Sequence, residues 1–309
     1  VADYNIAIGY QALKSGAFSG VDVDLEYNIA IGAEALWSTA ANSQLGTIAI
    51  GRSALKALTS GADNLAIGHL ALDAMTNGDG NLAIGRDALG NLNHTNADSN
   101  IAIGAYAGDA MGAYASQNNI FIGYAAGSGT FASASSDNIA IGKTAMNSPL
   151  DDADANIAIG TLALQDITQG DSNVVIGHHA ARELTTGSSN VVIGRQALQN
   201  DTDGATSVVI GYQAGSSITG STINTIIGYQ ACGSIDPTAD GLTGVVAIGH
   251  KALYGHSDTT TGVDNTVAVG RNALLSLTTG ARNLAIGYQA ADALTTSADN
   301  IAIGWDALG

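Results

Sequence analysis

The stretch Asn64-Leu65-Ala66-Ile67-Gly68, with the Ala71-Leu72 that follows it, is the unit from which this chain is built. The unit returns throughout the sequence, and its glycine stands at positions 9, 32, 51, 68, 85, 104, 123, 142, 160, 177, 194, 211, 228, 249, 270, 287 and 304. The commonest spacing between these glycines is 17 residues, and none is shorter. A fixed period of this length predicts a solenoid, in which each repeat stacks on the next.

The residues before the glycine have the pattern of a short strand. Counting the glycine as position 0, position −1 is Ile except at Val269, and position −3 is Ile, Leu or Val except at Thr225. Position −2 is Ala in most copies and is never polar. Branched apolar residues in alternation favour a β-strand, and an apolar residue at every position predicts a strand buried on both faces.

Position −4 is Asn in most copies, Asn81 and Asn156 among them. In a stack of identical coils these amides would bond to one another along the stack, and capping of the strand start is an equally good interpretation. The glycine itself predicts a backbone with φ > 0 or a close approach of neighbouring chains.

The residues after the glycine have the spacing of a helix. Position +3 is Ala in every copy, position +4 is usually Leu, and an apolar residue such as Leu58 or Ile167 often stands at +7. This 3, 4, 7 spacing predicts a short helical turn.

The predicted fold is therefore an all-β repeat protein. It is a parallel β-solenoid or β-roll of seventeen repeats of about 17 residues, with one short strand and one short helical turn per repeat. Residues 1–309 form a single continuous repeat region. The chain begins and ends inside a repeat, so we expect it to be part of a longer fibre.

We expect positions −3, −1, +3, +4 and +7 to fill the interior of each coil. We also expect each chain to stack its own repeats; the alternative is that three chains interleave strand by strand. The apolar column at −2 would then need a second chain to cover it. This predicts a parallel homo-oligomer, most simply a trimer, whose contact column includes Ala7, Ala66, Ala83, Ala158, Val192 and Ala302.

Composition excludes several classes of protein. Charged residues are 12% and apolar residues 46%, which argues against disorder. No apolar run is long enough to cross a bilayer. The net charge of −17 argues against binding to nucleic acid. Cys232 takes the place of the motif leucine and is expected to be a buried apolar residue.

Position +1 is the most informative exposed position. It carries half of the chain's ten basic residues beside several aromatic rings. A ladder for sugars is one interpretation, and a surface column or stacking between subunits is the other. The column comprises Tyr10, Arg52, His69, Arg86, Tyr124, Lys143, His178, Arg195, Tyr212, Tyr229, His250, Arg271, Tyr288 and Trp305.

Metal binding has weak support. Aspartates gathered in the turns could hold Ca²⁺ through oxygen, but none of them forms a complete calcium loop; they are Asp22, Asp24, Asp151, Asp152, Asp154, Asp201 and Asp203. His178-His179 with Glu183 lacks the order of a zinc-binding helix. No cofactor is predicted, and no catalytic set stands outside the repeat pattern, so an enzyme is not predicted.

Two segments carry a family resemblance. Asn-Ile-Ala-Ile-Gly-Tyr-Gln-Ala-Leu (5–13) and Asn-Leu-Ala-Ile-Gly-Tyr-Gln-Ala-Ala (283–291) resemble repeats of phage tail fibres and bacterial surface fibre proteins. Val-Ala-Ile-Gly (246–249) resembles the head repeats of trimeric autotransporter adhesins. The resemblance covers the entire chain, although the adhesin repeat is shorter. It implies a trimeric β-roll.

These patterns and the resemblance together suggest a non-enzymatic, structural shaft of an extracellular fibre, in a phage tail or on a bacterial surface. Such a shaft would space a tip that binds a host receptor or glycan. The alternatives are a self-polymerising filament and a carbohydrate-binding spike.

Overall fold

A computed structural model describes residues 2–14, 25–37, 44–235, 241–255 and 262–309 of the chain. The chain divides into two compact units, residues 1–155 and 156–309, and each is described by itself. Both units are built of short parallel strands joined by turns, and no helix occurs in the described ranges. This confirms the all-β parallel solenoid predicted from the repeat.

Every copy of the motif forms one three-residue strand at positions −3 to −1. In residues 1–155 these strands are β2 (Ile6–Ile8), β4 (Ile29–Ile31), β6 (Ile48–Ile50), β8 (Leu65–Ile67), β9 (Leu82–Ile84), β10 (Ile101–Ile103), β11 (Ile120–Ile122) and β12 (Ile139–Ile141). In residues 156–309 they are β13 (Ile157–Ile159), β14 (Val174–Ile176), β15 (Val191–Ile193), β16 (Val208–Ile210), β17 (Thr225–Ile227), β18 (Val246–Ile248), β19 (Val267–Val269), β20 (Leu284–Ile286) and β21 (Ile301–Ile303). A second, smaller sheet in residues 1–155 contains β1 (Ala2–Asp3), β3 (Leu25–Glu26), β5 (Gln44–Leu45) and β7 (Gly61–Ala62).

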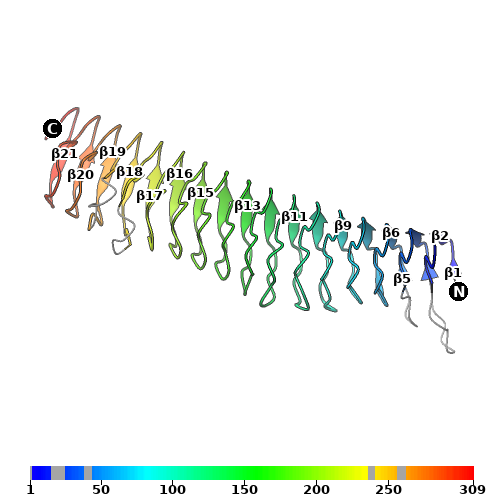
Figure 1. The fold of residues 1–309 in the computed structure, drawn as a ribbon. Helices are drawn as coiled ribbons and strands as arrows, with labels where there is room; N and C mark the ends of the chain where they lie inside the picture. The colour runs from blue at the N-terminus through cyan, green and yellow to red at the C-terminus, as the bar shows by residue number, and fades with distance from the viewer. Residues whose placement is uncertain (1, 15–24, 38–43, 236–240, 256–261) are drawn as a thin grey trace. The chain divides into compact units, whose positions relative to one another are not determined.

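Within each unit the strands pair in parallel and in register with their neighbours. Leu82 of β9 lies beside Ile101 of β10, and Ala83 beside Ala102. In the second unit Val174 of β14 lies beside Val191 of β15. The chain therefore stacks its own repeats, as expected, and successive coils of each unit follow one another in Figure 1.

The interior of each coil is formed by positions −2, +3, +4 and +7. Ala83, Ala88, Leu89 and Leu92 occupy these positions in one coil, and all have 0% exposure. Residue sizes compensate across this interior. Phe121 at −2 is fully buried, and a Cβ on Gly127, which replaces the usual Leu at +4, would meet its ring at 2.5 Å. Positions −2 and +4 therefore share one core.

The motif glycine meets both predicted requirements. Its φ lies between 129° and 145° in all copies, a conformation that is almost restricted to glycine. A Cβ on Gly85 would lie 2.4 Å from the carbonyl oxygen of Gly104 in the next coil. The short residue is thus needed both for the bend and for the close stacking of coils.

The predicted helical turn is wrong. Positions +2 and +4 have φ > 0 in every copy, for example Asp87 at 54° and Leu89 at 50°, whereas a right-handed helix requires negative φ. The segment is instead a series of tight turns. The Leu89 N–H donates to Ala107 O of the next coil at 2.9 Å, as Leu72 N–H does to Ala88 O at 3.0 Å. Coils about 4.8 Å apart leave no room for helices, which need 8–10 Å.

The asparagines at −4 form a buried ladder, which confirms the first of the two interpretations. Oδ1 of Asn100 accepts the backbone N–H of Asn119 at 3.1 Å and its Nδ2–H at 3.1 Å. Nδ2 of Asn100 donates to the carbonyl oxygen of Ser116 at 3.0 Å. Each amide therefore joins three successive coils or their turns, and no buried polar atom of Asn100 is left without a partner.

Candidate functional site

The outward side of each strand presents an apolar surface. The first and third residues of β2, β4, β6 and β8–β21 point away from the coil interior and are half-buried or exposed, whereas the middle residue is buried in all of these strands except β2, the first of its ladder. We call the surface made by these first and third residues the isoleucine face. Ile103 on it is 37% exposed and Ile176 is 36% exposed, although β10 and β14 each pair with a strand on either side.

This arrangement corrects the predicted chain contact. Ala66, Ala83, Ala158 and Val192 have 0% exposure and Ala302 has 3%, so they lie in the core of their own chain and cannot contact another. Ala7 is exposed, but it belongs to the first strand of its ladder, and its neighbour Ala30 is fully buried. The narrow coil accepts the small side chain at −2 and turns the larger ones outward.

The residues at +1, which we call the basic column, border the isoleucine face on one side. Their predicted exposure is confirmed: Arg86, Lys143 and Trp305 are exposed, and Tyr288 is half-buried. The column contains no acidic residue in either unit. Its ligand stays a prediction.

Aromatic rings of the basic column stack on one another. The ring centroids of Tyr212 and Tyr229 are 5.3 Å apart and those of Tyr229 and His250 5.1 Å, with interplanar angles of 13° and 10°. The Arg195 guanidinium lies 5.8 Å from the centre of the Tyr212 ring. Sugars bind through exposed ring faces, and here the faces are turned toward neighbouring coils. The geometry therefore favours stacking within the chain over a sugar ladder.

Positions −6 and −5 border the isoleucine face on the other side, and sequence reasoning missed them as a group. We call them the acidic edge, because their charged residues are Asp3, Glu26, Asp63, Asp79, Asp98, Asp137 and Asp154 in the first unit and Asp171, Asp264, Asp299 and the single basic Arg282 in the second. Asp79 Oδ1 accepts the Ala62 N–H at 2.8 Å, and Asp98 Oδ1 accepts the Asp79 N–H at 2.9 Å. The carboxylates thus hold the turn of the preceding coil.

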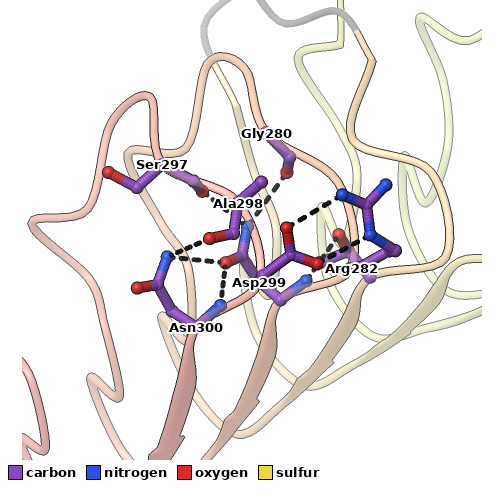
Figure 2. A network of polar contacts seen from close by, with 8 residues as sticks. Gly280, Arg282, Ser297, Ala298, Asp299 and Asn300 are labelled. Atoms are coloured by element: carbon purple, nitrogen blue, oxygen red, sulfur yellow. Dashed lines mark hydrogen bonds and ion pairs between the residues drawn. The ribbon is translucent and has the colours of Figure 1, made fainter.

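Arg282 is neutralised within its own chain. Its Nε and Nη2 donate to the two carboxylate oxygens of Asp299 at 2.7 and 2.9 Å, next to the Asn283–Asn300 step of the asparagine ladder (Figure 2). These hydrogen bonds from Arg282 lower the pKa of Asp299. The acidic edge therefore presents no unpaired cation in the second unit.

The calcium candidates are not brought together. Asp22 and Asp24 lie outside the described residues. Asp201 is fully buried, where its carboxylate accepts the Gly204 N–H and the Ser221 hydroxyl, whereas Asp203 is exposed. Asp154 Oδ1 accepts the Ser136 N–H at 2.6 Å. Asp151 is half-buried and Asp152 exposed. No group of three His, Cys, Asp or Glu residues suited to a metal occurs among the residues described.

The lone cysteine and the histidine pair noted in the sequence take part in packing within the chain. Cys232 is buried, as expected, and burial raises the pKa of its thiol. His178 and His179 stack at 4.0 Å, and partial burial with the nearby His178, Arg182 and Arg195 lowers the pKa of His179. The described ranges hold no helix that could span a membrane.

Comparisons with protein-family models, with curated proteins and with solved structures gave no match.

Proposed function

We propose that this chain is the structural, non-enzymatic shaft of an extracellular fibre, in a phage tail or on a bacterial surface, and that it spaces a receptor-binding tip. Several identical chains assemble in parallel to make the shaft. The number three rests on the resemblance to trimeric adhesin heads.

One observation carries this proposal: equivalent residues make the same contacts in coil after coil. The Ile120 N–H donates to Asn138 O at 2.8 Å in the first unit, and the Val174 N–H donates to Asn190 O at 2.8 Å in the second. A structure of this kind can be lengthened by adding coils without changing its cross-section. That property suits a spacer.

The test is to lengthen the chain. Duplicating residues 173–223, which hold three complete coils, should lengthen the particle by about 14 Å at an unchanged cross-section. Small-angle X-ray scattering measures both quantities, and electron microscopy shows whether the particles are discrete rods. A thicker or rounder particle would contradict the shaft. Particles that grow without a fixed length would support the self-polymerising filament instead.

Glycan binding is tested separately on a glycan array. Binding that is lost in Arg86→Ala and Tyr124→Ala variants would support the carbohydrate-binding alternative. We expect no such binding, because neighbouring side chains cover the faces of several rings in the basic column.

A further inference from the structure

The isoleucine face has the size of an interaction surface. Strands of three residues at a spacing of about 4.8 Å give a strip about 40 Å long and 10 Å wide in each unit, roughly 400 Å². The largest apolar patch on a typical soluble monomer is itself about 300–600 Å² and is often functional, so a strip of this size is a candidate interaction surface. The strip of each unit is thus about half of the roughly 800 Å² that one partner buries in a standard protein interface.

The two borders of this face carry opposite charge. In the first unit the basic column contributes Arg52, Arg86 and Lys143, and the acidic edge contributes only carboxylates, Asp63, Asp79 and Asp137 among them. In the second unit Arg195 and Arg271 border the face on one side, with Asp171 and Asp264 on the other. A second copy of the chain therefore offers both an apolar surface and complementary charge.

The orientation of that copy follows from symmetry. When two identical faces meet with their solenoid axes parallel, the left border of one lies against the right border of the other. The basic column of one chain then meets the acidic edge of the next. When the axes are antiparallel, like borders meet and like charges face each other, which is unfavourable.

We propose that identical chains bind one another in parallel through the isoleucine face, with the basic column of one chain against the acidic edge of the next. This deepens the proposed function, because it names the surface by which the chains of the shaft associate. It does not depend on the particle being a fibre. The same geometry accommodates two chains or a closed ring of more.

Carbodiimide cross-linking tests this directly, because it joins a lysine to a carboxylate only when they touch. Lys143 and Asp137 lie at opposite borders of the same strand, six residues and therefore about 20 Å apart in one chain. A Lys143–Asp137 or Lys143–Asp154 link must consequently join two chains. We expect such links, found by mass spectrometry in a mixture of ¹⁴N- and ¹⁵N-labelled protein as peptides of mixed isotope.

Matched variants distinguish the contribution of the isoleucine face to association from that of its charged borders. Lys143→Arg should abolish the link and keep the oligomer that light scattering detects, because the charge remains. Ile141→Asp places a charge on the half-buried isoleucine face and should give a monomer with an unchanged circular dichroism spectrum. Thr130→Asp makes the same change in charge at an exposed turn position and should leave the oligomer intact.

Three results would overturn the inference. One is a wild-type chain that stays monomeric in light scattering. Another is an oligomer whose inter-chain links join residues of the same border, which means antiparallel chains. The third is an Ile141→Asp oligomer as strong as that of Thr130→Asp. The third can occur while scattering still shows an elongated oligomer of parallel chains, so the inference about this face can fail without the shaft failing.

Discussion

Replacing glycine by alanine at two positions of one coil separates close stacking from backbone conformation. Gly85 has φ = 141°, and an added Cβ would lie 2.4 Å from the Gly104 carbonyl oxygen. Gly80, five residues earlier, has φ = 65°, and its nearest neighbour would be Ser99 Oγ at 3.7 Å. Ala155 already occupies the position equivalent to Gly80 in another coil, with φ = 56°.

The two substitutions should therefore differ several-fold in their effect on the free energy of unfolding. Gly85→Ala combines a glycine-only conformation, about 1–3 kcal/mol, with an overlap against backbone that adds about 1–3 kcal/mol. The sum is roughly 2–6 kcal/mol, a large share of the stability of a typical domain. Gly80→Ala adds only a left-handed conformation, about 1 kcal/mol.

Guanidinium denaturation of both variants measures the overall decrease in the free energy of unfolding. Native-state hydrogen exchange then shows which coils are destabilised. Exchange is needed because long repeat arrays do not always unfold in one step. In Gly85→Ala we expect lost protection at the Gly104 N–H, which donates to Ile84 O at 2.8 Å in the wild type. Equal shifts of the denaturation midpoint in the two variants would refute the argument that stacking of coils requires this glycine.

Three further predictions concern the buried polar groups and the core. Asn100→Ala should destabilise the chain by about 1–3 kcal/mol, because the Asn119 N–H loses its acceptor, whereas Asn118→Ala, which removes only an exposed hydrogen bond to Asp137 Oδ1, should cost less; thermal melts compare the two. Ala158→Asp should be far worse than Asp154→Ala, since it puts a carboxylate inside the coil while the second change removes only the hydrogen bond to Ser136 N–H; equal melting temperatures would contradict this. Burial and the neighbouring Asp87 raise the pKa of Asp109 from 3.8 to about 6. A raised carboxyl pKa means that the folded state holds its proton more tightly, so stability should fall as the pH rises from about 4 to 6. Asp109→Asn should remove that part of the pH dependence and Asp63→Asn should not, as denaturation midpoints across this range will show.

The repeat period and the strand pattern were sufficient to predict a parallel solenoid with an asparagine ladder. The prediction that position −2 contacts another chain was wrong, because alternation shows that a strand has two faces without showing which face is inside the coil. The sequence does contain a signal for this choice. Phe121 at −2 stands in a coil where Gly127 replaces the motif leucine at +4, and Val209 at −2 is followed by Gly215. Such exchange of size is expected only if −2 and +4 fill the same interior.

The helical turn was mispredicted for a different reason. The 3, 4, 7 spacing of Ala88, Leu89 and Leu92 is shared by a helix and by the tight turns seen here. Positive φ at non-glycine residues such as Asp87 is imposed by contacts with adjacent coils, which propensity does not report. The opposed charges of the acidic edge and the basic column become visible only when the coils are aligned in register.

The asparagine ladder also bears on how the protein ages. Asparagine deamidates when the backbone nitrogen of the next residue attacks its side-chain carbonyl carbon. In the ladder that nitrogen is held elsewhere, as where the Ile101 N–H donates to Asn119 O at 2.8 Å. The Asn100 amide is itself fixed by its neighbours. Spontaneous chemical damage should therefore begin outside the ladder, at turn asparagines followed by glycine such as Asn77-Gly78, while the column of buried amides keeps its original composition.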